Sequence, residues 1–419
     1  MKGFLDGYRI LDFGHAIAGP FATMIMGDLG AEVIKIGSVP RPEPKTTRYE
    51  EVEITQWMCN HWAHNRNKQS ICLDMKNPSG RAIFYDLLKK SDVVFDNFRP
   101  HVLKNIGIDY ETVRQHNPKI ISCSISGYGQ YGPWKEAAAY DLISQAMGGT
   151  MSITGEPGRM PLRCGVAIGD FIPAFYAVIA ITSALLGREK TGEGQRIDLA
   201  MLDCQLAMQS YRAAAVFSMG KEFGPTPRRS GAAAQVPYGA FQCKDQKWIA
   251  ITGGAVQFWG PICQAMGLEH LINDPRYDTN SKRQQREVEL TRVFEEAFLT
   301  KTADEWEKIL LAVKVPAAKV LSIREAFLHP QAQAREMLVS IADHPVGQKI
   351  KMPANPIKPL SPESKVEYQL APALGEHTQE VLSALLGYSA ERMGQLRQEG
   401  AIWWSDEGIY YAADYSRYA

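Results

Sequence analysis

The chain has 419 residues, of which 46 are basic and 46 acidic, so its formal net charge at pH 7 is zero. This length is sufficient for two domains with cores of their own. Balanced charge without a long run of one sign argues against a nucleic-acid surface or a polybasic membrane anchor, and favours a small-molecule partner.

Seven scattered cysteines show no C-x-x-C spacing, which argues against a disulfide framework or a zinc site and predicts a cytoplasmic protein. Residues 1–6 lack the charged and apolar regions of a secretory signal. The apolar run 171–187 is short for a membrane span and contains Pro173, so we expect a buried core helix there.

Strand-like and helix-like segments alternate through the first 130 residues. The pattern predicts helices at 21–30 and 77–91, and strands at 8–13, 31–36, 92–98 and 118–129. Such repeated units indicate an α/β fold, with a Rossmann-like large domain whose parallel sheet is covered by helices on both faces.

A loop at 14–20 follows the first predicted strand. Its spacing Gly14-x4-Gly19 matches neither the P-loop nor the dinucleotide-binding pattern, so both nucleotide motifs are excluded. Loops after parallel strands meet the edge of the sheet where ligands bind, so this loop is either a ligand contact or a plain turn.

The second half of the chain predicts a smaller α+β domain. Residues 196–217 have an apolar pattern that looks helical, and the Gly/Pro-rich segment 220–231 looks like a linker. Two strands lie within 238–254, and helical segments follow. We therefore divide the chain into a first part of the large domain (1–215), a linker and small domain (216–330), and a C-terminal part that returns to the large domain (331–419).

The C-terminal part alternates helical and extended segments. It predicts a helix at 322–338, a Pro-rich extended run at 352–364 and a helix at 377–387. The aromatic tail 402–419 is too apolar for a free end, so we expect it to dock on this chain or on a partner.

Asp170 is the carboxylate with the most informative context. It follows Gly169 and precedes the apolar helix, so a helix N-cap is the ordinary interpretation. Metalloprotease, serine-hydrolase and C-x-x-C signatures do not occur in the sequence, and no metal or cofactor is expected.

Several long segments resemble class III coenzyme-A transferases, the family of formyl-CoA transferase and carnitine-CoA transferase. They are AGPFATMIMGDLGAEVIKI, NRNKQSICLDMKNPSGRAIFYDLLKKSDVVFDNFRP, HNPKIISCSISGYGQYGP, the Gly-Asp pair at Asp170, REKTGEGQRIDLAMLD, AKVLSIREAFLHPQAQAREM and LGEHTQEVL. The resemblance implies that Asp170 attacks an acyl-CoA, giving an aspartyl anhydride and then an aspartyl-CoA thioester. It also implies a homodimer of two interlocked, ring-like chains.

The resemblance also assigns a set of coenzyme-A contacts. Lys76 would contact a phosphate and Phe98 the adenine region. The implied contacts are His15, Ala16, Ile17, Ala18, Leu73, Lys76, Asn97, Phe98 and Tyr140, with Arg99 or Lys104 as substitutes for a family arginine that aligns with Asn105.

The chain departs from the family pattern at three further places. Gly37 and Ser38 replace an acidic residue and an arginine, with Arg41 the nearest arginine, and Ala138 replaces a lysine. Ala232–Ala234 replace glycines of the loop that covers oxalate in formyl-CoA transferase, which argues against formate and oxalate. Arg228 and Arg229 beside it could bind the second carboxylate of a small dicarboxylate such as succinate, although a solvated basic linker is the favoured interpretation of this pair.

Two other functions remain open at this point. The related 2-methylacyl-CoA racemases use a histidine thirty positions before the aspartate, where this chain has Tyr140. Because an unperturbed tyrosine has a pKa near 10, it is a poor proton shuttle, and the transferase is favoured. A non-catalytic acyl-CoA-binding protein would not need Asp170.

Overall fold

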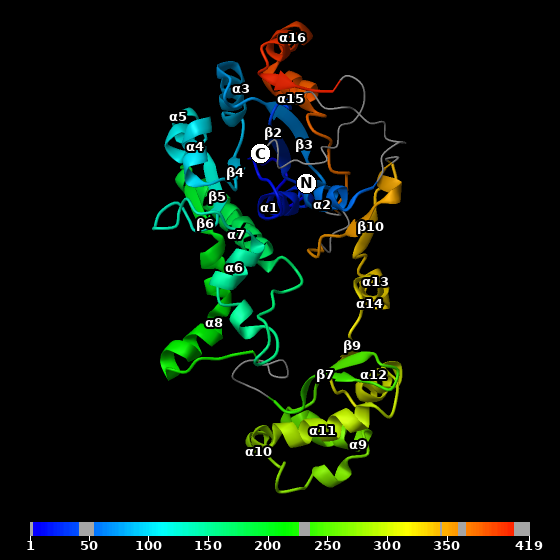
Figure 1. Cartoon of the computed structure of the whole chain (residues 1–419). Helices are drawn as coiled ribbons and strands as arrows, with labels where there is room; N and C mark the ends of the chain where they lie inside the picture. The colour runs from blue at the N-terminus through cyan, green and yellow to red at the C-terminus, as the bar shows by residue number, and fades with distance from the viewer. Residues whose placement is uncertain (1–2, 42–53, 226–234, 344–345, 359–365, 406–419) are drawn as a thin grey trace. The chain divides into compact units, whose positions relative to one another are not determined.

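The computed structural model describes residues 3–41, 54–225, 235–343, 346–358 and 366–405. The chain divides into two compact units, which we call the large and the small unit (Figure 1). The large unit contains residues 1–148, 165–208 and 331–419, and the small unit contains 149–164 and 209–330. The domain boundaries after residues 215 and 330 stay predictions.

A mostly parallel sheet of seven strands forms the centre of the large unit. The strand order is β12-β3-β2-β1-β4-β5-β6, and only β12 runs antiparallel to its neighbour. The strands are β1 (Arg9–Asp12), β2 (Glu32–Gly37), β3 (Gln69–Leu73), β4 (Val93–Asp96), β5 (Ile121–Ser126), β6 (Arg196–Ala200) and β12 (Ile402–Trp403). The strands that follow β1 are added first on one side of it, as β2 and β3, and then on its other side, as β4, β5 and β6. Where the strand order reverses in this way, a crevice is expected at the carboxyl ends of the two central strands, β1 and β4.

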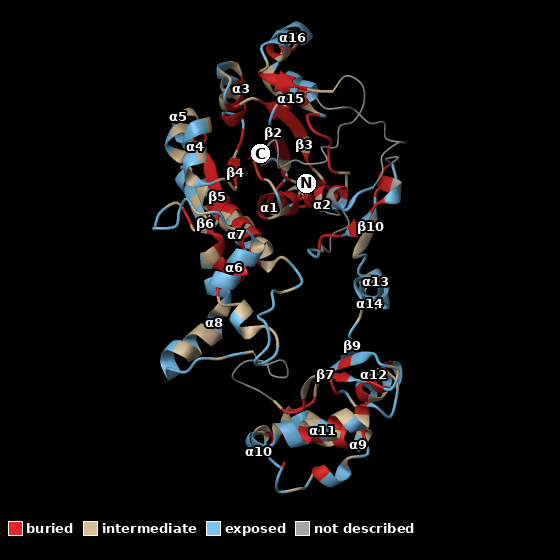
Figure 2. Ribbon diagram, viewed as in Figure 1, coloured by how far each residue is buried: buried red, intermediate tan, exposed pale blue. Residues whose placement is uncertain are grey.

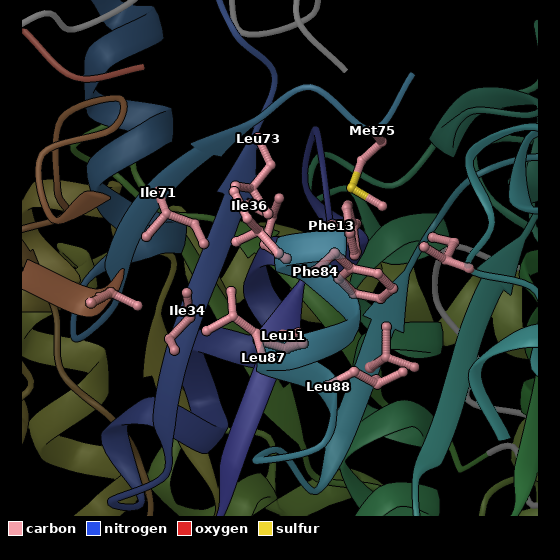
Figure 3. Packing of buried hydrophobic residues seen from close by; sticks show 14 of the residues in the cluster. Leu11, Phe13, Ile34, Ile36, Ile71, Leu73, Met75, Phe84, Leu87 and Leu88 are labelled. Atoms are coloured by element: carbon pink, nitrogen blue, oxygen red, sulfur yellow. The ribbon is translucent and has the colours of Figure 1, made fainter. Parts of the chain in front are cut away.

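Helices cover both faces of this sheet, as predicted. Neighbouring residues of β1 point to opposite sides, so Ile10 and Leu11 belong to different hydrophobic clusters. Figure 3 shows the cluster around Leu11, where strand residues pack against Phe84, Leu87 and Leu88 of α3. The helices of the large unit are α1 (Ala18–Asp28), α2 (Gln56–Asn65), α3 (Pro78–Leu88), α4 (Pro100–Ile106), α5 (Tyr110–His116), α6 (Asp141–Met147), α7 (Ile168–Thr191), α15 (Thr378–Leu386) and α16 (Ala390–Gln398). Helix α8 (Met201–Met219) is divided between the two units after Met208.

Helix α7 is the one described helix whose length and apolar composition would allow it to cross a membrane. Its residues Ala174, Ala177 and Ile181 are fully buried in the cluster that also contains Ile10 of the sheet. Figure 2 shows that the strands of the large unit's sheet are buried. One face of α7 therefore packs in this core, while Phe175, Ile179 and Leu186 on the same helix are exposed, so the expected buried core helix is confirmed only for one face.

The small unit contains an antiparallel sheet of order β7-β8-β9. The two predicted strands within 238–254 are confirmed as β7 (Tyr238–Gln242) and β8 (Trp248–Thr252). Phe241, Phe294 and Trp306 are buried in its core. Its other elements are β9 (Ala317–Lys319), α9 (Val256–Ala265), α10 (Asn280–Gln285), α11 (Glu287–Phe298), α12 (Ala303–Ala312), α13 (Ile323–Leu328) and the short helices at Met151–Ile153 and Glu269–Leu271.

Two predicted helices are wrong in part. Residues 196–200 form strand β6, because they pair in parallel with β5, a contact that local periodicity cannot reveal. The helix predicted at 322–338 is broken into α13 and α14 (Pro330–Ala334), since the residue before Pro330 is held in an extended conformation.

The C-terminal segments return to the large unit. Strands β10 (Leu338–Ser340) and β11 (Lys351–Pro353) pair with each other, with a short helix at Gly347–Lys349 between them. The start of the aromatic tail docks on its own chain, where β12 pairs with β3 and Trp403 is buried. Residues 406–419 of the tail lie outside the described residues.

A buried ion pair attaches this C-terminal return to the ends of α1 and α2. The guanidinium of Arg66 donates to both carboxylate oxygens of Asp28, at 3.0 and 2.7 Å, and to the carbonyl of Pro353 at 2.8 Å. Asn355 donates to the same carboxylate at 3.1 Å. Since both charged side chains are almost completely buried, each depends on the other for compensation.

We therefore expect Arg66→Met to destabilise the protein strongly, by about 3–5 kcal/mol, because Asp28 would keep a buried and unpaired charge. The free energy of unfolding in urea measures this change. Arg114→Ala, which removes a partner from an exposed pair with Glu111, is the matched control and should change it by less than about 1 kcal/mol. Equal losses in the two variants would contradict the argument.

Candidate functional site

A pocket of about 1010 Å³ lies at the carboxyl ends of β1, β2, β4 and β5, within the large unit. The segments that follow these strands form its walls, and Asp170 of α7 is also part of its lining. The crevice expected from the strand order is therefore present. Its volume is at the upper end of the range for small-molecule pockets, which suits a long ligand.

The loop from Gly14 to Ala18 forms one wall, and two glycines make its shape possible. A Cβ on Gly19 would lie 2.9 Å from the Cα of Gly14, and a Cβ on Gly14 would lie 2.7 Å from Asp12 Oδ1. Ala16 has a φ of 57°, an uncommon value for a residue with a side chain. The spacing Gly14-x4-Gly19 therefore reflects a closed loop rather than a plain turn.

Polar groups below the loop hold its backbone. Asp12 accepts the N–H of Gly14 at 2.7 Å, and the buried ammonium of Lys35 donates to the carbonyl of Gly14 at 2.5 Å. Asn97 holds His15 from the next strand, because its side chain accepts the His15 N–H and donates to the His15 carbonyl, both at 2.9 Å. The loop is thus fixed before any ligand arrives.

The imidazole of His15 stacks on Phe98, with ring centroids 5.2 Å apart. Burial, and to a lesser degree the charge of Lys35, lowers the pKa of His15 to about 4, so the ring is neutral at physiological pH. Its Nδ1 is buried and has no hydrogen-bond partner within the described part of the chain. A neutral aromatic pair of this kind can receive a flat, uncharged group.

The pocket brings together most of the residues that the sequence predicted. Lys104 is not part of the lining, and neither is Asn105. Of the predicted residues, the lining contains His15, Ala16, Ile17, Ala18, Leu73, Lys76, Asn97, Phe98, Arg99, Tyr140 and Asp170, and it also contains Gly37 and Ala138.

Exposed cations line the pocket with these residues. Lys76 and Arg99 were predicted, Arg41 was noted as the nearest arginine, and Lys135 was missed. Arg41 is paired with Asp74 at 2.9 Å. Because Asp74 and Asp170 are the acidic residues among the described part of the lining, positive charge dominates there.

Asp170 is the third residue of α7, so the N-cap interpretation is wrong. The cap position is Ala167, and the backbone N–H groups of Asp170 and Phe171 both donate to its carbonyl at 3.0 Å. Within the described residues, no hydrogen bond reaches the Asp170 carboxylate.

Burial is the main reason that Asp170 has an unusual acidity. Burial, and to a lesser degree the negative charge of Asp141, raises the pKa of Asp170 to about 6. The position in the first turn of a helix would favour the charged form, but desolvation outweighs that effect here. A carboxylate of this kind is ionised at pH 7, yet it is more basic and less solvated than an ordinary aspartate.

Asp141 is a functional candidate that the sequence reasoning missed. Its carboxylate accepts the N–H of Gly169 at 2.8 Å and the side-chain amide of Gln145 at 2.7 Å. A Cβ on Gly169 would lie 2.8 Å from the backbone oxygen of Asp141, so glycine is required before Asp170. The signal available in the sequence was the Tyr140-Asp141 dipeptide, which precedes the Gly169-Asp170 pair by 28 positions.

Lys35, His61 and Asn65 also line the pocket and were not predicted. Lys35 and Asn65 lie in quoted family segments, but only the fold shows that they face the ligand space. Arg228, Arg229 and Ala232–Ala234 lie outside the described residues. Among the residues that the structure describes, no group of three or more acidic, histidine or cysteine side chains is placed to hold a metal ion.

Comparison with known proteins identifies similar chains along nearly the whole length. The model of CoA-transferase family III matches residues 5–378. The human succinyl-CoA:glutarate CoA-transferase is 34% identical over 400 residues, which cover 95% of this chain and 90% of that protein. The succinate–glutarate CoA-transferase of Agrobacterium fabrum is 36% identical over 397 residues, covering 91% and 95%.

A solved structure also shares the fold. A CAIB/BAIF family protein from Brucella suis has a TM-score of 0.78 and 32% sequence identity, covering 92% of this chain and all of that one.

The electrostatics of Asp170 lead to a direct test. We expect its carboxyl group to titrate near pH 6, and Asp141→Asn to lower this pKa by about 0.5–1 unit because a like charge is removed. The asparagine oxygen can still accept the Gly169 N–H, so the helix terminus is kept. Carboxyl ¹³C chemical shifts of ¹³C-aspartate protein, followed against pH, give the pKa of Asp170 in the wild type and in Asp141→Asn. The signal of Asp170 is assigned by its loss in Asp170→Asn. An unchanged pKa in the Asp141→Asn variant would show that the two charges do not interact.

Proposed function

The chain belongs to CoA-transferase family III, whose members transfer coenzyme A between acyl-CoA thioesters and carboxylic acids, and we propose that Asp170 is the residue that carries the acyl group. The observation that carries this proposal is a desolvated carboxylate without a hydrogen-bond partner in the described residues, which lines the pocket that the glycine-closed loop also forms. A structural aspartate in a helix terminus would normally be used as a cap or an ion-pair partner.

The proposed reaction alternates between two covalent forms of Asp170. The carboxylate attacks the thioester carbonyl, the C–S bond breaks, and CoA thiolate leaves a mixed anhydride on Asp170. The thiolate then attacks the aspartyl carbonyl, which releases the donor acid and leaves an aspartyl-CoA thioester. The acceptor carboxylate attacks this thioester to form a second anhydride, and the thiolate takes the new acyl group and frees Asp170.

The pocket supports this chemistry by charge and by desolvation. A pKa near 6 keeps Asp170 ionised at pH 7 while it raises the basicity, and therefore the nucleophilicity, of the carboxylate. Partial burial limits the access of water to an anhydride. The cations Arg41, Lys76 and Arg99 suit the phosphates of coenzyme A, and the neutral His15–Phe98 pair suits its adenine or pantetheine part.

We further propose a small dicarboxylate, such as succinate, as donor or acceptor acid. Both relatives described above are named for transfer between succinate and glutarate, at 34% and 36% identity. As the reaction exchanges one thioester for another, it needs neither a metal ion nor ATP. The cytoplasmic location remains part of the proposal, and all seven cysteines are free thiols.

A homodimer is also proposed, as the family resemblance implies. Within the large unit, apolar side chains are exposed on α6, α7 and α8, among them Phe175, Ile179 and Leu186 of α7 and Leu206 and Met208 of α8. Exposed apolar side chains gathered on adjoining helices are typical of an interaction surface. A second copy of this chain is the partner we propose for them.

Trapping with hydroxylamine tests the covalent mechanism. Wild-type protein incubated with a panel of acyl-CoA thioesters should yield the hydroxamate of Asp170, detected by mass spectrometry of the peptide. Asp170→Asn should abolish transfer, by a factor on the order of 10⁴ or more, since the nucleophile is lost. Asp203→Asn, an exposed aspartate on α8, is the matched control and should be trapped as the wild type is.

Other outcomes would assign the chain differently. Exchange of the hydrogen next to the thioester with deuterated solvent, without a hydroxamate, would indicate the racemase. Binding of CoA esters without either reaction would indicate a binding protein, and both results would contradict transfer through Asp170.

The dimer leads to a separate prediction. Sedimentation should give a mass twice the 46.6 kDa of one chain. If the chains are interlocked, two differently tagged preparations should not exchange subunits when they are mixed and diluted without denaturant. Rapid exchange would contradict interlocking, and a monomer would contradict the dimer itself.

A further inference from the structure

Two side chains of the pocket wall, His61 and Asn65, and the buried Lys68 beside them form hydrogen bonds that reach the C-terminal segment. The Nε2 of His61 lies 3.1 Å from the carbonyl oxygen of Pro372, and its Nδ1 lies 3.2 Å from the amide nitrogen of Asn65. The amide oxygen of Asn65 accepts a hydrogen bond from the ammonium of Lys68 at 3.0 Å. Residues 61 and 65 are one helical turn apart on α2, so both point the same way.

The same hydrogen bonds continue to the loop at 14–18. Lys68 donates to Asp12 at 2.9 Å and to the carbonyl of Pro20 at 2.9 Å. The other carboxylate oxygen of Asp12 accepts the N–H of Gly14 at 2.7 Å. A continuous chain therefore joins the carbonyl of Pro372 to the backbone of Gly14.

This chain is buried along its whole length. The exposed fractions of His61, Asn65, Lys68 and Asp12 are 6%, 3%, 4% and 0%. Removal of one member therefore leaves its neighbour without water to replace the lost partner. Gly14, Pro20, His61 and Asn65 line the pocket, while Asp12 and Lys68 are not part of its lining.

With Lys68 charged beside Asp12, the hydrogen bonds described above favour one arrangement. The Asn65 amide nitrogen also donates to the backbone carbonyl of His61 at 3.0 Å. A lysine ammonium can only donate, so the Asn65 oxygen must face Lys68 and its nitrogen must face His61. Nδ1 of His61 is then the acceptor, and Nε2 carries the proton that is donated to Pro372. Burial lowers the pKa of His61 to about 3, which agrees with a neutral ring.

We propose that His61, Asn65 and Lys68 are positioning residues that hold the loop Gly14–Ala18 in the conformation that binds coenzyme A. The inference rests on the proposed function, because it assigns the loop to coenzyme A. None of the three transfers an acyl group. They act through Asp12, which fixes the Gly14 N–H, and through the Pro20 carbonyl in the first turn of α1, so they fix the loop at both ends.

Asn65→Leu is the variant that interrupts the chain with little change in side-chain volume. It should weaken the binding of free CoA, measured by calorimetry, about tenfold, the size expected when one buried hydrogen-bond partner is lost. The rate of hydroxamate formation at a saturating concentration of a reactive thioester should stay within about threefold of the wild type, because Asp170 is not touched.

Asn355→Leu is the matched control. Asn355 is equally buried at 2% exposure and donates to Asp28, but it does not line the pocket. Both variants should lower the free energy of unfolding, and only Asn65→Leu should weaken CoA binding. Equal affinities for CoA in the two variants would overturn the inference.

The tautomer of His61 supplies a test that needs no destabilised variant. In ¹⁵N-histidine wild-type protein at pH 7, assigned by the loss of signals in His61→Gln, His61 should show a protonated Nε2 and a bare Nδ1. A protonated Nδ1 would overturn the inference, since the Asn65 amide could no longer donate to it.

The inference and the proposed function fail in different ways. If the wild type forms the Asp170 hydroxamate but Asn65→Leu binds CoA with wild-type affinity, only the positioning role is lost. If the wild type binds no CoA, both are lost.

Discussion

The ion pair between Asp12 and Lys68 is the interaction on which the site depends most. Both side chains are fully buried, and each would be very costly alone in that environment. They therefore remain together, and their remaining hydrogen-bonding groups are used by the Gly14 N–H and the Pro20 carbonyl. The need to compensate two buried charges thus fixes the loop that forms one wall of the pocket.

A second balance of interactions sets the pKa and the solvation of Asp170. Asp141 takes up the free N–H of Gly169 at the start of α7, so Asp170 is released from the capping role that its place in the sequence suggested. Burial and the nearby negative charge then raise its pKa instead of lowering it. The result is an ionised but poorly solvated carboxylate, which is the state that an attack on a thioester requires.

Segments that are far apart in the sequence support both features. Residues 61–68 end α2 and lead into β3, and they contact the C-terminal return through Arg66 and His61 and the loop through Lys68. The sequence shows only residues 65–68 of this stretch as part of a family-like run. Its role becomes visible when Asp12, Asp28 and Pro372 are brought beside it, because the partners are between 38 and 311 positions away.

The alternation of apolar strands and amphipathic helices was sufficient to predict the parallel sheet, its helical cover and the edge where the pocket lies, because strands that are buried on both faces have a continuously apolar sequence. The family-like segments pointed to Asp170 and to ten further residues that the structure places in the pocket lining. Only the tertiary structure decided that residues 196–200 are a strand, that Asp170 is not a cap, that Lys104 is outside the lining, and that Asp141 and Asn65 belong to the site. The physical reason is the same in each case: strand pairing, desolvation and buried hydrogen bonds depend on distant partners, which local spacing does not encode.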